Sequence, residues 1–271
     1  MLLTEQRNPK TMHLDRMSSL EIVQVMNEEN AYSVACLEPA LPQIAKAIDV
    51  IAEAFSREGR LLYLGAGTSG RLAVVDAAEC PPTFGVPREQ VVGIIAGGMH
   101  TMIHASENAE DDPQDGIREL KERELNSRDV VVGISAAGGA AYVCNALEYA
   151  KSIGCTTVGV TSNPGSRLDE VSDISIAVNS GPEVLTGSTR LKAGNTQKMI
   201  LNMLSTGAMV RSGYVYENLM INLKPTNIKL RGRVIRIVSQ ITGLSEAEST
   251  ALLEKGNWVI RDALQIWKQE G

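Results

Sequence analysis

The sequence predicts an α/β protein whose core is a doubly wound, parallel, five-stranded sheet. Three observations predict this fold class. Short apolar runs alternate with helical segments, each run has the length of a buried strand, and a glycine-rich turn joins the first run to a helix. The five predicted strands are residues 61–64, 91–96, 130–134, 156–160 and 174–178.

The N-terminal part is predicted to be an arm followed by two helices. Residues 1–17 are polar and are expected to form an extended arm. Ser18 is a typical N-cap for a helix to Asn30, with Leu20, Val23 and Met26 on one apolar face. A second helix is predicted over 44–55, where apolar residues recur at helical spacing.

Helical segments at 116–124 and 142–152 connect later strands, and a long helix is predicted over 188–212. Two short helices follow, at 231–241 and 246–253. We therefore expect an N-terminal arm with helices at 1–43, a domain built around the sheet at 44–215 and a helical region at 216–271. This last region is short for an independent core, so it is expected to pack on the sheet domain or on a partner subunit.

Composition limits the class of protein. At 271 residues and 44% hydrophobic content, the chain can bury the core of one large α/β domain. A net charge of −6 argues against a nucleic-acid surface, and no apolar run is long enough to span a membrane. The four cysteines are scattered and no signal peptide is visible, which predicts reduced thiols in a cytoplasmic protein.

The stretch that organises the chain is the glycine turn after the first strand. Gly65, Gly67 and Gly70 let the backbone approach a ligand closely, and Thr68 and Ser69 add two hydroxyl groups. A strand, a glycine turn and a helix N-terminus form an anion site, because free N–H groups converge there and the helix dipole favours negative charge. The pattern predicts a phosphate cradle.

Two glutamates are candidates for acid–base chemistry. Glu79 follows the cradle in the next helix, which Pro81 and Pro82 are expected to end. Glu110 lies in an acidic stretch after the second strand. Both are expected at the edge of the sheet where the strands end, one as general acid and one as general base. The alternative is that the acids around Glu110 are solvated loop residues or a helix cap.

Other ligands fit the sequence less well than a phosphate does. The six residues from Gly65 to Gly70 also spell G-x-G-x-x-G, but the strand after them ends in Gly97-Gly98-Met99 without the acid that a dinucleotide ribose needs. His100, His104 and Glu107 share a helical spacing but lack a fourth zinc ligand, and the aspartates at 111, 112 and 115 are the only support for magnesium. We therefore predict no metal and no cofactor.

Two further stretches reach the same edge of the predicted sheet. The third strand delivers Ser135, and Gly138 follows it before the next helix. Residues 181–194, at the start of the long helix, contain Glu183, Ser188 and Thr189. Ser188 and Thr189 are typical N-cap residues, which alone would explain them, but the stretch is more polar than capping requires. All five are candidate substrate-binding residues.

Four motifs together resemble one family closely. They are Gly-Ala-Gly-Thr-Ser-Gly-Arg from Gly65, Glu-Cys-Pro-Pro-Thr from Glu79, Ala-Glu-Asp around Glu110, and the stretch 181–194. They resemble the bacterial N-acetylmuramic acid 6-phosphate etherases, from residue 4 to about residue 233. The resemblance implies a sugar isomerase (SIS) domain and a cytoplasmic homodimer. Its implied role is cell-wall amino-sugar recycling, by cleaving the lactyl ether of N-acetylmuramic acid 6-phosphate to N-acetylglucosamine 6-phosphate and D-lactate.

The resemblance places the two catalytic glutamates on Glu79 and Glu110. It implies elimination of lactate followed by addition of water, with Glu79 as the acid at the ether oxygen and Glu110 as the base for water. Which of the two removes the C2 proton stays open. Glucokinase regulatory proteins share these motifs without catalysis, so a sugar-phosphate-binding regulator is the alternative function.

The sequence departs from the family at the second loop. Residues 136–142 read Ala-Ala-Gly-Gly-Ala-Ala-Tyr, where the family usually has Ala-Ser-Gly-Arg-Thr-Pro-Tyr. A serine, an arginine and a threonine are missing. We therefore expect Thr68 and Ser69 to hold the phosphate, with help from Ser188, while residues 136–140 contribute backbone N–H groups alone.

Overall fold

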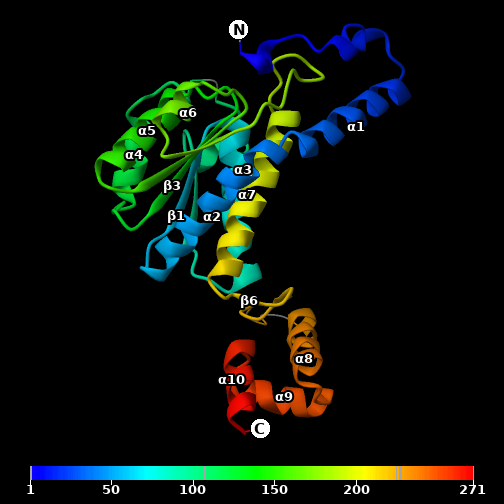
Figure 1. The fold of residues 1–271 in the computed structure, drawn as a ribbon, viewed down its shortest axis with the longest axis vertical. Coiled ribbons are helices and arrows are strands. Elements are labelled where there is room, and N and C mark those ends of the chain that lie inside the picture. Colours follow the sequence, from blue (N-terminus) through cyan, green and yellow to red (C-terminus); the bar gives the residue numbers. More distant parts are fainter. Residues whose placement is uncertain (1, 107, 224, 226–227, 271) are drawn as a thin grey trace. The chain divides into compact units, whose positions relative to one another are not determined.

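The computed structural model describes residues 2–106, 108–223, 225 and 228–270 (Figure 1). Its centre is a parallel five-stranded sheet in the order β2-β1-β3-β4-β5, so the predicted fold class is confirmed. The strands are β1 (Leu61–Gly65), β2 (Val91–Ile95), β3 (Val130–Ser135), β4 (Thr156–Thr161) and β5 (Ile174–Ala177). The chain divides into two compact units, Met1–Ala78 with Glu89–Ala208, and Glu79–Arg88 with Met209–Gly271.

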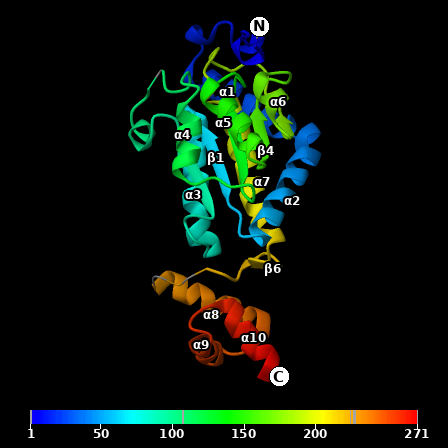
Figure 2. The same ribbon diagram turned by 90° about the vertical axis from the view of Figure 1, so that its left-hand side faces the viewer.

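Helices cover both faces of the sheet, as Figures 1 and 2 show. One face carries α4 (Asp115–Glu122), α5 (Ala141–Ser152) and α6 (Arg167–Val171); the other carries α2 (Leu41–Ser56), α3 (Gly67–Phe84) and α7 (Lys192–Arg211). The core between the sheet and the first group contains Leu62, Val131 and Leu147, all fully buried. Since β1 pairs with both β2 and β3, the loops that follow these strands meet at one edge.

The predicted extended arm is instead a series of short 3-10 turns. They are η1 (Leu3–Glu5), η2 (Pro9–Thr11) and η3 (Leu14–Arg16). The helix after them, α1 (Ser19–Ala35), begins as predicted, with a capping box in which the Ser18 side chain and the Glu21 carboxylate bond each other's backbone N–H. Two residues of its predicted apolar face are exposed, Leu20 to 64% and Val23 to 58%.

The end of α3 differs from the prediction. Pro81 and Pro82 do not end this helix, which continues to Phe84. A proline in the last turn loses one hydrogen bond to the preceding turn, but its fixed φ is compatible with a helix. The Gly85 N–H then closes the turn on the carbonyl of Pro81, at 2.8 Å.

The start of α7 also differs from the prediction, since the helix begins at Lys192 and not near Ser188. Ser188 and Thr189 are therefore not its N-cap residues. The Glu183 carboxylate accepts the N–H groups of Lys192 and Ala193 instead, each at 2.9 Å. A side chain nine residues upstream thus caps the helix, which no local pattern reports.

The second unit has a hydrophobic core of its own, so the expectation that residues 216–271 are too few for one is wrong. It contains the hairpin β6 (Val215–Tyr216) and β7 (Leu219–Met220), and the helices α8 (Ile228–Thr242), α9 (Glu246–Lys255) and α10 (Ile260–Glu270). Val234, Val238 and Leu253 are fully buried in this core. Among the described residues of the chain, no helix is long and apolar enough to cross a membrane.

Candidate active site

A cavity of about 290 Å³ lies at the edge of the sheet where the strands end. Five segments line it, namely the loops after β1, β3 and β5, the stretch around Glu110 and the N-terminal arm. The lining residues are Glu5, Ala66, Gly67, Thr68, Ser69, Glu110, Ile134, Ser135, Ala136, Ala137, Ala140, Gly187 and Thr189. The cavity therefore brings together residues that the sequence analysis selected in separate stretches.

The loop after β1 has the strand–turn–helix geometry that the predicted anion site requires. Gly67 has a φ of +53°, a conformation that favours glycine, and it is the first residue of α3. The first helical hydrogen bond runs from the Gly70 N–H to the Ala66 carbonyl. The amides of Gly67, Thr68 and Ser69 precede this bond, at the positive end of the helix dipole. This arrangement suits a phosphate group.

Gly70, a predicted binding residue, is not in the lining. A Cβ there would lie 2.4 Å from the Gly65 carbonyl oxygen and 2.6 Å from a side-chain carbon of Ile95. Gly70 therefore allows α3 to pack closely against the strands. It shapes the loop without facing the cavity.

Ser69 is held by a residue that the sequence analysis did not select. Its Oγ donates to Oε1 of Gln197 at 3.0 Å, and both side chains are buried. The Gln197 Nε2 has no hydrogen-bond partner among the described residues. Gln197 lies in α7, 128 residues further along the chain, so no sequence spacing connects it to the cradle.

The loop after β3 uses part of its own hydrogen-bonding capacity internally. The Gly138 N–H donates to Ser135 Oγ at 3.1 Å, and the Gly138 carbonyl accepts from the Leu168 N–H at 2.9 Å. Gly138 is therefore not in the lining, and its predicted contact with substrate is not supported. Ser135 does line the cavity, and its hydroxyl proton remains for a ligand because the oxygen accepts from Gly138.

The stretch before α7 contributes less to the cavity than its polarity predicts. Thr189 lines the cavity, whereas Ser188 does not. Glu183 is fully buried as the cap of α7 and does not line the cavity, so its predicted contact with substrate is not supported. Burial raises the pKa of Glu183, against the lowering effect of the N–H groups of Ala193 and Lys192.

Glu110 brings an exposed carboxylate to the cavity, as predicted. Its carbonyl accepts the Tyr142 N–H at 3.0 Å, which fixes its backbone against the start of α5. Another acid of this stretch, Asp112, accepts the Gln114 N–H at 2.8 Å through its Oδ1, just before α4. Glu110 is therefore the acid of the stretch that is presented to a ligand.

The placement of Glu79 differs from the prediction. It lies in α3 twelve residues after Gly67, which is about 18 Å along the helix at ~1.5 Å per residue. The expectation that both glutamates follow strand ends at one edge is therefore wrong for Glu79. Its side chain is exposed near the far end of the helix.

The charged side chains among the described lining residues of the cavity are all negative. Among its described lining residues, the charged side chains are Glu5 and Glu110, and neither lysine nor arginine is present. Attraction for an anion must then come from helix and backbone dipoles. Among the described residues, no three histidine, cysteine, aspartate or glutamate side chains are grouped so that they could hold a metal ion. Glu107, one of the zinc ligands considered above, lies outside the described residues.

Comparisons with known proteins agree with this fold. Residues 43–151 match the glucokinase regulatory protein N-terminal SIS domain, and residues 112–207 match the SIS domain. A putative phosphosugar isomerase of Bacteroides fragilis, 21% identical, superposes with a TM-score of 0.57 over 74% of this chain and 94% of its own. A putative sugar-phosphate isomerase of Listeria monocytogenes, 19% identical, gives 0.55 over 73% and 94%.

The fold and the cradle therefore define a protein of the SIS class. Two relatives carry the name N-acetylmuramic acid 6-phosphate etherase. That of Cronobacter sakazakii is 49% identical over 97% of this chain and 89% of its own, and that of Pasteurella multocida is 50% identical over 94% and 85%. The chain belongs to the N-acetylmuramic acid 6-phosphate etherase family.

Proposed function

We propose that this protein is a lyase that cleaves the lactyl ether of N-acetylmuramic acid 6-phosphate, giving N-acetylglucosamine 6-phosphate and D-lactate. The observation that carries the proposal is one cavity in which the open N-terminus of α3 and the Glu110 carboxylate are both presented. The near-full-length relatives that bear this name support it. A cytoplasmic role in recycling cell-wall amino sugars follows from that substrate.

The phosphate would be held by hydroxyl and amide groups without a cation. Thr68, Ser69 and Ser135 line the cavity with hydroxyls, around the amides that begin α3. Ser69 becomes a donor to phosphate if the Gln197 amide turns over, because Nε2 then donates to Ser69 Oγ and releases the serine proton. The same turn gives the unpartnered Nε2 of Gln197 a hydrogen bond.

The chemistry begins at the ring-opened sugar, where the C1 aldehyde acidifies the C2 proton. A glutamate removes this proton, and the lactate oxygen leaves C3 with a proton from Glu79. Water then adds to C3 with Glu110 as the base, and the C2 position is reprotonated. Each acid or base contributes ~10²–10⁴-fold to the rate.

Glu79 would act from a second copy of the chain, in a symmetric homodimer. Two observations support this proposal. Glu79 lies about 18 Å along α3 from Gly67, at ~1.5 Å per residue, whereas Glu110 lines the same cavity as Gly67. Helix α1 also exposes Leu20 and Val23, an apolar surface that a second copy would cover.

Mixing two inactive variants tests this arrangement. Glu79→Gln and Glu110→Gln should each bind N-acetylglucosamine 6-phosphate but lose at least ~10²-fold in lactate release. After subunit exchange of an equal mixture, about one quarter of wild-type activity should return, since half the dimers are mixed and each has one intact site. A mixture that stays inactive would contradict the shared site, and a monomer mass in light scattering would contradict the dimer.

The second candidate is a regulator that binds a sugar phosphate without turnover. The match of residues 43–151 to the glucokinase regulatory protein SIS domain favours it. An assay of lactate from N-acetylmuramic acid 6-phosphate separates the two functions. Absence of lactate with intact sugar-phosphate binding would establish the regulator and refute the lyase.

A further inference from the structure

The N-terminal arm is fixed to the wall of the cavity by a single buried amide side chain. Asn163 accepts the Leu3 N–H at 2.8 Å and donates to Thr4 Oγ1 at 3.3 Å. Its Nδ2 also donates to the Ala136 carbonyl at 2.8 Å, in the loop that follows β3. Asn163 is 4% and Thr4 0% exposed, so solvent does not compete for these bonds. The start of the arm is therefore attached to a loop that lines the cavity.

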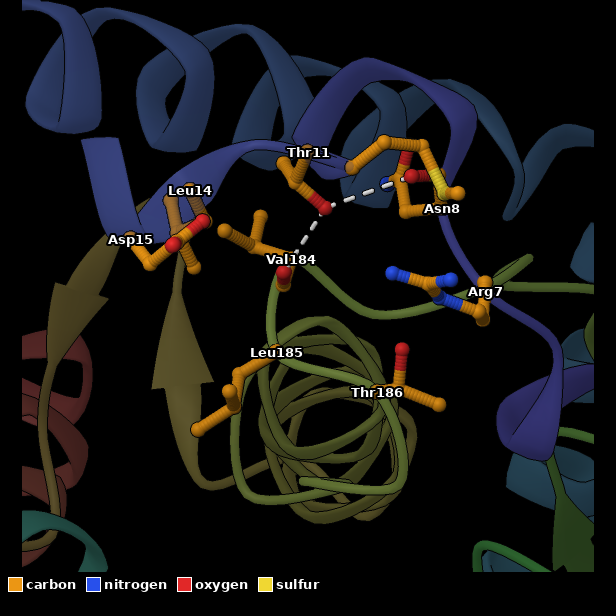
Figure 3. Close-up of a pocket in the computed structure, with 9 residues that line it drawn as sticks. Arg7, Asn8, Thr11, Leu14, Asp15, Val184, Leu185 and Thr186 are labelled. Carbon is orange, nitrogen blue, oxygen red and sulfur yellow. Dashed lines mark hydrogen bonds between the residues drawn. The ribbon is translucent and has the colours of Figure 1, made fainter. Parts of the chain in front are cut away.

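The arm is also attached to the stretch after β5, on another side of the same cavity. The Thr4 carbonyl accepts the Gly187 N–H at 3.3 Å. Further along, Thr11 Oγ1 donates to the Val184 carbonyl at 2.8 Å, a bond that Figure 3 shows beside Leu185 and Thr186. Bonds at both ends thus hold residues 3–11 in place.

Glu5 is the arm residue that reaches the cavity. Its carboxylate lies beside Gly187, where a Cβ would be 3.2 Å from Glu5 Oε2. Among the described residues, none donates a hydrogen bond to this carboxylate or forms an ion pair with it. Glu5 is exposed, and its carboxylate remains available as an acceptor.

A carboxylate at this place needs a neutral, donating group opposite it. A phosphate dianion would be repelled, and the lining offers no cation that would offset the repulsion. A sugar presents several hydroxyl groups, and a carboxylate that accepts from a hydroxyl forms a strong, charge-assisted bond. Glu5 therefore suits the sugar portion of the ligand, while the start of α3 suits its phosphate.

We propose that Glu5 is a specificity-determining residue whose carboxylate accepts hydrogen bonds from hydroxyl groups of the sugar. The inference rests on the proposed function, because it assumes that a sugar phosphate occupies the cavity. It adds a third carboxylate to the two glutamates of the lyase chemistry. The role of Glu5 is recognition, whereas proton transfer belongs to Glu79 and Glu110.

Two ligands separate the sugar from the phosphate in a test. N-acetylglucosamine 6-phosphate carries both groups, and methyl phosphate carries phosphate without hydroxyls. For Glu5→Ala, the Kd of the sugar phosphate should rise about tenfold or more, while that of methyl phosphate stays the same or falls because a negative charge is gone. Asp15→Asn, on the same arm, is the matched control and should alter neither Kd.

Glu5→Gln keeps the size of the side chain and guards against a variant that fails to fold. It should weaken the sugar phosphate less than Glu5→Ala, since its amide oxygen still accepts. An equal loss of both ligands would show a displaced arm and overturn the proposal, as would unchanged binding of the sugar phosphate. If the wild-type protein binds neither ligand, the proposed function fails before Glu5 is tested.

Discussion

Two loops with the same strand–turn–helix geometry lie side by side at the cavity and serve different purposes. After β1, the amides at the start of α3 precede the first hydrogen bond of the helix, so they have no partner within it. Thr68 of the same loop lines the cavity. In the loop after β3, by contrast, backbone groups form hydrogen bonds with other parts of the fold. Ala136 O accepts from the Ser162 N–H and from Asn163, and Gly138 bonds Ser135 and Leu168.

This difference bears on the prediction that residues 136–140 contribute backbone N–H groups alone, which is wrong for the Gly138 N–H and stays a prediction for the other residues. The Gly138 N–H is taken by Ser135, and the Tyr142 N–H is taken by the Glu110 carbonyl. What this loop provides is the Ser135 hydroxyl, a fixed Glu110 and an attachment for the arm through Asn163. A shared backbone geometry thus does not imply a shared chemical role.

The largest expected effect is a loss of stability when the second loop, which follows β3, is altered. Gly138 has a φ of +74°, and a Cβ there would be 2.1 Å from Ser166 Oγ. Gly138→Val should therefore lower the free energy of unfolding by about 3 kcal/mol or more, through strain and overlap together. Gly139→Ala is the matched control, because no atom lies within 4 Å of its Cβ position, and it should stay within ~0.5 kcal/mol. Equal stabilities in urea would contradict the comparison.

The next largest effect is a loss of sugar-phosphate affinity when the first loop, which follows β1, is altered. Ser69→Ala removes a hydroxyl at the start of α3 and should raise the Kd for N-acetylglucosamine 6-phosphate about tenfold or more, since charge-assisted bonds contribute ~1.5–3 kcal/mol. Calorimetry measures this change, with exposed Ser152→Ala as the control. Unaltered affinity would contradict a phosphate site at Gly67–Ser69.

The smallest expected effect sharpens the comparison at the second loop. Ala137 lines the cavity at a position where the family usually carries serine. Ala137→Ser should leave the Kd unchanged or lower it by a few-fold, because one neutral hydrogen bond contributes ~0.5–1.5 kcal/mol. A clear loss of affinity would show that the ligand lies too close to residue 137 to leave room for a hydroxyl group.

Much of this protein follows from its sequence alone. The apolar runs predict all five strands to within one or two residues, since a strand buried on both faces needs continuous apolar side chains. Ser18 predicts the N-cap of α1, and Glu21, three residues further on, completes a capping box there. The order of strands and glycines likewise places Thr68, Ser69 and Glu110 at one edge.

The tertiary structure decided which of these polar groups remain free for a ligand. The sequence predicts Glu183 as a binding residue, but both of its carboxylate oxygens accept N–H groups at the start of α7. Gly138 is predicted likewise, but its N–H donates to Ser135. Glu5 enters the cavity because Asn163, 159 residues beyond Thr4, holds the arm. Hydrogen-bond partners distant in sequence leave no periodic pattern, so these outcomes became visible when the chain was folded.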